Sequence, residues 1–133
     1  MNGFDELLRT MNLEFFGKGK HRVKPCEHLY NDEGILLDVR SKEEYETLAI
    51  KLFHHLPVMH IPVEEIPDRI DEIPRNKSIG IFCSSGTRAA IVYAYLRLKG
   101  FDSDRVKILE GGYQALIQEL STGKILERIL TKE

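Results

Sequence analysis

The chain has 133 residues and a formal net charge of −2, with 42% hydrophobic and 30% charged residues. This length favours a single domain, which buries roughly two-thirds of its unfolded surface and so needs no disulfide or metal to hold its core. The slightly acidic balance argues against a nucleic-acid binder. All apolar runs are far shorter than the ~20 residues of a membrane-spanning helix, which argues against a membrane protein.

The N-terminal segment predicts a short helix outside the main domain. Apolar residues recur at helical spacing over residues 4–12, and residues 13–20 are expected to end the helix and break it. We predict an N-terminal helical extension over residues 1–21 and the main domain over residues 22–133. The extension is expected to pack on the domain surface, with a partner-docking or dimer element as the alternative. A basic cluster lies near the end of this segment and comprises Lys18, Lys20, His21, Arg22 and Lys24. We expect it to be a solvated loop that could attract an anionic partner.

In the main domain, short apolar runs typical of buried strands alternate with helical patterns. This alternation predicts an α/β fold with a mostly parallel central sheet and helices on both faces. In such sheets, ligands bind at the carboxyl ends of the strands. The expected strands are residues 35–39, 58–61, 78–82 and 106–109, with 78–82 as the central strand. The expected helical segments begin at Pro25 and at Ser41, where Glu44 completes a capping box, and cover residues 68–73, 87–99, 113–120 and a final turn or two around residues 125–130.

The most informative segment is residues 83–88, Cys-Ser-Ser-Gly-Thr-Arg, which joins the strand at 78–82 to the helix that follows. A cysteine in a loop between a strand and a helix N-terminus faces backbone N–H groups and the positive end of the helix dipole. Such surroundings favour the thiolate, which is the nucleophilic form of cysteine. The alternative is an inert, buried core cysteine; Gly86 and Arg88 favour the reactive interpretation.

Four motifs in this order give the chain a resemblance to a known family. The loop at 83–88 resembles the active-site loop of rhodanese-like sulfurtransferases. Residues 36–45, Leu-Leu-Asp-Val-Arg followed by an acidic helix start, are similar to the first signature of that family. Residues 60–62 and the Gly-Gly turn at 110–113 also match. The resemblance covers about residues 22–121 and implies a three-layer α/β sandwich, here a single-domain thiosulfate sulfurtransferase.

The resemblance implies a covalent, two-step sulfur transfer through Cys83. The thiolate attacks a sulfane sulfur of thiosulfate or a persulfide, and cyanide or a protein thiol then removes that sulfur. Arg88 is expected to bind the sulfonate of thiosulfate through a bidentate contact, with an ion pair to a surface carboxylate as its alternative. Asp38 and Arg40 are expected to be structural, tying strand ends near the loop. The expected substrate-binding residues are Ser84, Ser85, Gly86, Thr87 and Arg88.

This chemistry needs no metal and no organic cofactor. The expected partners are a small sulfur donor and acceptor or a sulfur-carrier protein, with no nucleic acid or membrane, and the chain is expected to be a monomer or weak homodimer. Residues 1–6 lack the basic start and apolar stretch of a signal peptide, so we expect a cytoplasmic protein with reduced thiols. His54, His55 and His60 lie close in sequence, but a metal site there is not expected.

Three other functions are considered. Cysteine phosphatases related to this fold place five residues between Cys and Arg, whereas only four separate Cys83 from Arg88, which leaves less room for a phosphate. A non-catalytic module or regulatory persulfide carrier is the second alternative. Thiol-redox chemistry with Cys26 as the resolving cysteine is the third, although the two cysteines lie far apart and in no metal-ligand spacing.

Overall fold

A five-stranded sheet forms the centre of the molecule in the computed structural model, which describes residues 3–47 and 56–119. The strands are β1 Arg22–Val23, β2 Gly34–Asp38, β3 Val58–His60, β4 Ser78–Phe82 and β5 Val106–Leu109. They lie in the order β1-β5-β4-β2-β3, and every pairing between neighbours is parallel. The predicted α/β class with a parallel sheet is therefore confirmed, and β4 occupies its predicted central place.

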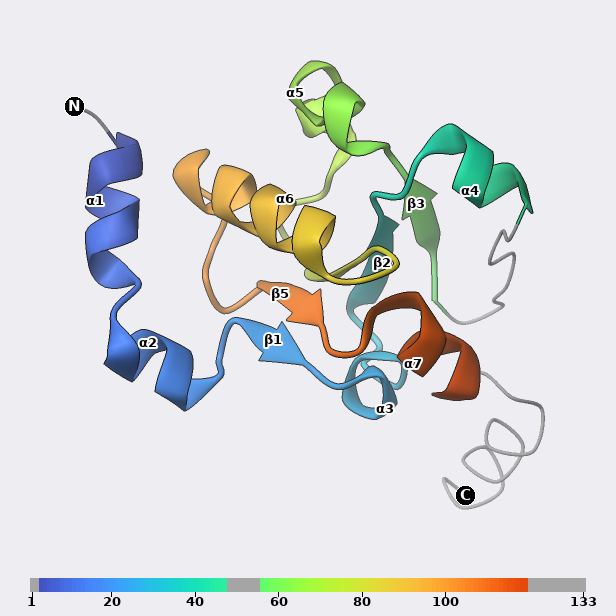
Figure 1. Cartoon of the computed structure of the whole chain (residues 1–133), viewed down its shortest axis with the longest axis horizontal. Coiled ribbons are helices and arrows are strands. Elements are labelled where there is room, and N and C mark those ends of the chain that lie inside the picture. The colour runs from blue at the N-terminus through green and yellow to red at the C-terminus, as the bar shows by residue number, and fades with distance from the viewer. Residues whose placement is uncertain (1–2, 48–55, 120–133) are drawn as a thin grey trace.

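Helices cover both faces of this sheet, with α6 on one side and α3 and α7 on the other (Figure 1). The α-helices are α1 Gly3–Thr10, α2 Leu13–Lys18, α3 Pro25–His28, α4 Lys42–Thr47, α5 Ile66–Arg69, α6 Thr87–Leu98 and α7 Gly112–Glu119, and two 3₁₀ turns, η1 Val63–Glu65 and η2 Ile70–Glu72, flank α5. Each face has its own apolar core, so the molecule is a three-layer sandwich.

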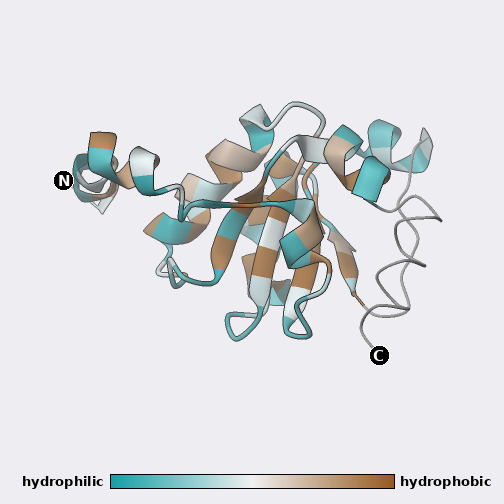
Figure 2. Ribbon diagram, turned by 90° about the horizontal axis from the view of Figure 1, so that it is seen from below, coloured by the Kyte–Doolittle hydropathy of each residue, from teal (hydrophilic) through white to brown (hydrophobic). Residues whose placement is uncertain are grey.

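Alternate residues of β2 point into these two cores because side chains of a strand alternate between its faces. Ile35 and Leu37 pack in the core beneath α6, whereas Leu36 packs in the core beneath α7. All five residues of β2 are buried. Because helices cover both faces of the sheet, a strand at this position has a nearly continuous apolar sequence. Figure 2 shows apolar, brown segments on the central strands and hydrophilic, teal loops at one end of the sheet.

The N-terminal segment forms two helices instead of the single one predicted. The α1 helix ends at Thr10, and Asn12 then starts α2 by accepting the N–H of Phe15 on its side chain at 3.0 Å. Gly17 lies inside α2, and Gly19, with φ of 64°, provides the left-handed C-cap. The expectation that residues 13–20 break the helix was wrong because an N-cap side chain restarted it.

The strand β1 was not predicted. It pairs with β5, so that Arg22 lies opposite Ile108 in the sheet. With two residues and no apolar run, β1 gives no periodic signal, and its place depends entirely on β5. Part of the basic cluster therefore lies at a sheet edge rather than in a solvated loop.

Three sequence-based expectations concern residues outside the described part of the chain, namely His54, His55 and the turn around residues 125–130. Within residues 3–47 and 56–119, every helix falls short of the length and apolarity that a membrane crossing requires.

Candidate active site

Cys83 lies where β4 ends, at the carboxyl edge of the sheet, and its sulfur accepts two backbone hydrogen bonds. The N–H of Gly86 reaches Sγ at 3.0 Å and the N–H of Ala89 at 3.4 Å. Gly86 makes this possible because its φ of 96° lies in the left-handed region, where glycine turns the loop into α6 without strain. The loop thus points amides at the sulfur, as the sequence predicted, although Ala89 lies beyond the predicted residues.

Cys83 is fully buried and belongs to the apolar core beneath α6. A simple core cysteine has apolar neighbours, whereas this sulfur also faces two N–H donors that favour its charged form. The exposed side chains of the loop are Ser84, Ser85 and Thr87. The Cys83 side chain itself is covered in this structure.

The Gly-Gly turn before α7 supports the loop from the other side. The N–H of Tyr113 donates to the carbonyl of Cys83 at 2.9 Å. Gly112 has φ of 59°, and a Cβ at this position would lie 2.7 Å from the carbonyl oxygens of Cys83 and Ser84. Only glycine lets the start of α7 come this close to the loop backbone.

Glu44, in the first turn of α4, joins this helix to the Cys83 loop. Arg88 makes a bidentate contact with its carboxylate, with Nη1 at 2.5 Å from Oε1 and Nη2 at 3.1 Å from Oε2. The hydroxyl of Ser84 donates to Oε2 at 2.8 Å and accepts from Arg88 Nη2 at 2.8 Å. Ser41 completes the predicted capping box, since its N–H and hydroxyl both donate to Oε1 at 3.0 Å.

These contacts hold Glu44 and Arg88 in their charged forms. Hydrogen bonds from Arg88, then from the backbone of Ser41 and the hydroxyl of Ser84, keep the pKa of Glu44 well below its usual range. The pKa of Arg88 is raised, chiefly by its hydrogen bond to Glu44 and then by the charge of Glu44, which together outweigh the opposing effect of burial. The structure thus gives Arg88 the ion pair that the sequence left as its alternative role.

Asp38 and Arg40 form a second, fully buried ion pair at the end of β2. Arg40 Nη2 lies 2.8 Å from Asp38 Oδ2, and the side chains are 2% and 0% exposed. Burial lowers the pKa of Arg40, but the hydrogen bonds and charge of Asp38 outweigh that effect and raise it. The Arg40 guanidinium also lies 4.3 Å from the ring centre of Tyr113 on α7. This geometry fits the structural role expected of the pair.

Sequence reasoning identified Glu44 only as a capping residue and missed its contact with the loop. A signal was present: Glu44 lies four residues after Arg40, at the end of β2, and therefore at the same sheet edge as the loop that follows β4. The register of β2 with β4 places Asp38 opposite Phe82, one residue before Cys83.

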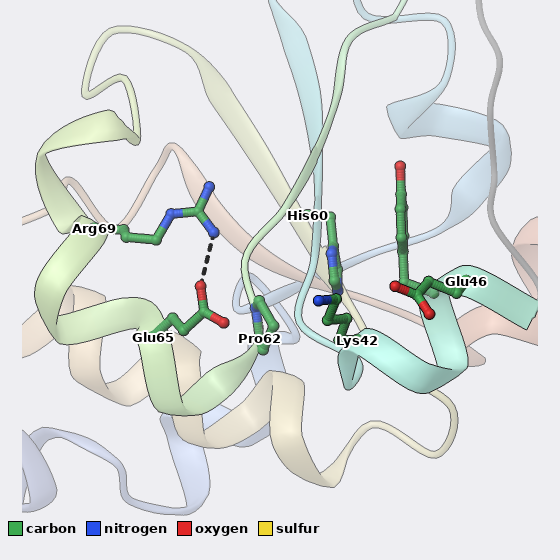
Figure 3. A pocket seen from close by; sticks show the side chains of 7 residues that line it. Lys42, Glu46, His60, Pro62, Glu65 and Arg69 are labelled. Atoms are coloured by element: carbon green, nitrogen blue, oxygen red, sulfur yellow. Dashed lines mark hydrogen bonds and ion pairs between the residues drawn. The ribbon is translucent and has the colours of Figure 1, made fainter.

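In the described part of the chain, two of the cavities lie away from the Cys83 loop. The larger, of about 350 Å³, is bounded by α4 on one side and the Glu65–Arg69 ion pair on the other (Figure 3), and a Tyr45–His60 ring stack at 4.0 Å lies in its wall. The smaller, of about 190 Å³, is lined by Phe15, His21 and Tyr93 among others. In the described residues, no three His, Cys, Asp or Glu side chains gather as a metal site.

These observations define a parallel α/β sandwich that holds one cysteine in a loop of backbone N–H donors at the carboxyl edge of its sheet. The model of the rhodanese-like domain matches residues 23–119. The chain therefore belongs to the rhodanese-like domain family, as its motifs predicted, and helices α1 and α2 precede the matched part.

The curated relatives are named for sulfur chemistry. The putative sulfurtransferase YtwF of Bacillus subtilis is 31% identical over 96 residues, which cover 72% of this chain and 81% of YtwF. The putative sulfur carrier protein YrkF of the same organism is 38% identical over 73 residues, covering 53% of this chain and 36% of YrkF. The chain also matches tRNA sulfurtransferases of two Aeromonas species, of which it covers 15% and 17%. It thus spans only a minor part of several of these proteins.

Solved structures agree on the fold. A rhodanese-like domain protein from Staphylococcus aureus superposes with a TM-score of 0.55 at 27% identity, covering 71% of this chain and 89% of that one. An NAD-dependent persulfide reductase from A. fulgidus gives a TM-score of 0.56 at 36% identity, covering 75% of this chain and 17% of that one.

Proposed function

We propose that the protein is a sulfurtransferase in which Cys83 carries a sulfane sulfur as a persulfide. The observation that carries this proposal is the pair of N–H groups of Gly86 and Ala89 directed at the cysteine sulfur. Backbone N–H groups at a helix N-terminus stabilise an anion. They would therefore favour both the thiolate that attacks and the persulfide anion that results.

The reaction has two steps, and each breaks one sulfur–sulfur bond. The Cys83 thiolate attacks the outer sulfur of thiosulfate, the sulfur–sulfur bond of thiosulfate breaks, and sulfite leaves with the electron pair. With a thiol persulfide as donor, the thiol leaves instead. Cyanide or an acceptor thiolate then takes the terminal sulfur and restores the Cys83 thiolate. A cysteine that attacks as the thiolate needs no general base.

The names of relatives support this class of chemistry, since they include sulfurtransferases and a sulfur carrier protein. We propose that this chain has a small sulfur donor, or a protein thiol that carries sulfur, as its partner. The substrate-contacting groups in this proposal are the loop residues 84–88. A persulfide carrier without turnover is the remaining alternative.

Intact mass spectrometry tests the proposal directly. The wild-type protein, incubated with thiosulfate or with an alkyl persulfide, should gain the mass of one sulfur atom, and cyanide should remove it with release of thiocyanate. Cys83→Ser should neither gain the sulfur nor form thiocyanate, because it lacks the thiolate. Thiocyanate formation undiminished in Cys83→Ser would refute the proposal, and loading without repeated turnover would identify a carrier.

A further inference from the structure

We infer that Glu44 determines donor choice, disfavouring donors that carry an oxyanion and leaving persulfides of uncharged thiols as the preferred donors of Cys83. This inference rests on the proposed function. It assigns to the first turn of α4 a specificity role in addition to helix capping.

The carboxylate of Glu44 occupies the position that a sulfonate would need. Both terminal nitrogens of Arg88 are engaged by its two oxygens, in the fork geometry with which guanidinium binds an oxyanion. A sulfonate that used Arg88 in the same way would have to displace Glu44. It would also approach a fixed negative charge, so the pair offers thiosulfate little net attraction.

Displacement is costly because Glu44 is held from three directions. Besides Arg88, it accepts hydrogen bonds from Ser84 on the loop and from Ser41 at the start of α4. The side chains of Glu44 and Arg88 are 37% and 34% exposed, so solvent screens the pair without separating it. A persulfide of an uncharged thiol needs no contact with Arg88 and is not penalised.

Glu44→Gln removes the negative charge of the side chain and keeps its shape. Glutamine keeps an oxygen that can accept from Arg88 or Ser84, but it leaves the guanidinium without a counter-charge. The rate of Cys83 loading should be measured by mass spectrometry with thiosulfate and with the persulfide of 2-mercaptoethanol. We expect the thiosulfate-to-persulfide ratio of rates to rise about tenfold or more, the size of one charged hydrogen bond.

Glu43→Gln is the matched control, since Glu43 is the preceding, exposed residue of α4 and the net charge changes equally. This variant should leave the ratio unchanged. In an Arg88→Ala background, Glu44→Gln should raise the ratio much less, because the freed cation is then absent and only the repulsion between the carboxylate and thiosulfate is removed. If circular dichroism shows that Glu44→Gln does not fold, Glu44→Asp takes its place. Aspartate keeps the charge on a shorter side chain that cannot engage both nitrogens of Arg88, so this variant should raise the ratio in part.

An unchanged ratio in folded Glu44→Gln, with persulfide loading intact, would overturn the specificity role alone. Equal acceleration with both donors would also overturn it and would assign Glu44 to loop anchoring only. Failure of the wild-type protein to load from either donor would instead refute the proposed function.

Discussion

At the scale of single residues, the site depends on how each charge or sulfur is surrounded. Cys83 and Cys26 differ in this respect. Cys83 is fully buried and accepts two backbone N–H groups, whereas Cys26 is half-buried in the short helix α3. Sulfur exchange through a persulfide needs one sulfur only, so the second cysteine has no assigned task.

Cys26→Ser should therefore keep sulfur transfer near the wild-type rate, and thiocyanate formation from thiosulfate or a persulfide with cyanide measures it. Cys83→Ser is the natural comparison. A loss of tenfold or more in Cys26→Ser, about 1.4 kcal/mol of barrier, would favour a relay between the two cysteines.

Arg88→Ala should raise KM for thiosulfate by up to about fivefold, because it leaves the Glu44 charge uncompensated beside the loop and an exposed charge interaction contributes up to about 1 kcal/mol. Loading from a persulfide of an uncharged thiol should change less, and Arg88→Lys should recover part of the loss because a point charge lacks the fork.

Steady-state kinetics with both donors measure this difference, and Arg97→Ala, on the same helix but bonded to Tyr93, is the control. An equal loss with both donors, or no loss, would make Arg88 a structural residue.

At the scale of elements, the loop is positioned by three helices, its own helix α6 and the more distant α4 and α7. Its own helix α6 supplies the N–H of Ala89, α4 supplies Glu44, and the start of α7 donates to the Cys83 carbonyl. The close approach of α7 depends on Gly112, whose missing side chain leaves room for two loop carbonyls.

Gly112→Ala should destabilise the fold by about 1–3 kcal/mol, because the new Cβ meets backbone oxygens at a positive φ. It should also slow sulfur loading, because it shifts the loop carbonyls. Urea unfolding measures the first effect. Gly17→Ala is the matched control: nothing lies within 4 Å of its Cβ position in α2, so it should be neutral or stabilise by up to about 1 kcal/mol. Equal stability of the two variants would contradict the close fit.

At the scale of the whole molecule, two apolar cores hold the sheet between its helices, and a few polar groups are buried with them. One is His28 of α3, whose Nε2 lies 2.6 Å from the carbonyl of Ile35. It packs against Gly80, where a Cβ would lie 2.7 Å from the ring. Burial lowers the pKa of His28, although the hydrogen bond to Ile35 opposes this effect.

Folding stability should therefore fall as the pH is lowered. In the unfolded chain His28 binds a proton near pH 6.5, whereas in the folded state it binds one only at lower pH. The contribution of His28 to the free energy of unfolding is therefore fully present above pH 6.5 and is lost as the pH falls below it. Burial also lowers the pKa of His21, which contributes in the same direction. The midpoint of thermal unfolding should drop between pH 7.5 and 5.5, and the drop should be smaller in His28→Gln. An identical pH dependence in both proteins would contradict this role for His28.

The sequence alone determined the alternation of strands and helices and the strand–loop–helix setting of Cys83. These features are local, since apolar runs, a capping box and turn glycines act on neighbouring residues. It did not predict β1, because a two-residue strand has no periodicity of its own. It also did not predict the new helix α2, because the N-cap residue Asn12 favours a helix where the nearby glycines oppose one.

Only the tertiary structure decided what surrounds the sulfur and the charges. Glu44 and Arg88 are 44 residues apart, and no local pattern announces their contact. It arises because β2 and β4 are parallel neighbours whose carboxyl ends meet at one edge of the sheet. The place of Cys83 in a loop at the carboxyl edge of the sheet could thus be predicted from the sequence, whereas the carboxylate that neutralises Arg88 required the pairing of distant strands.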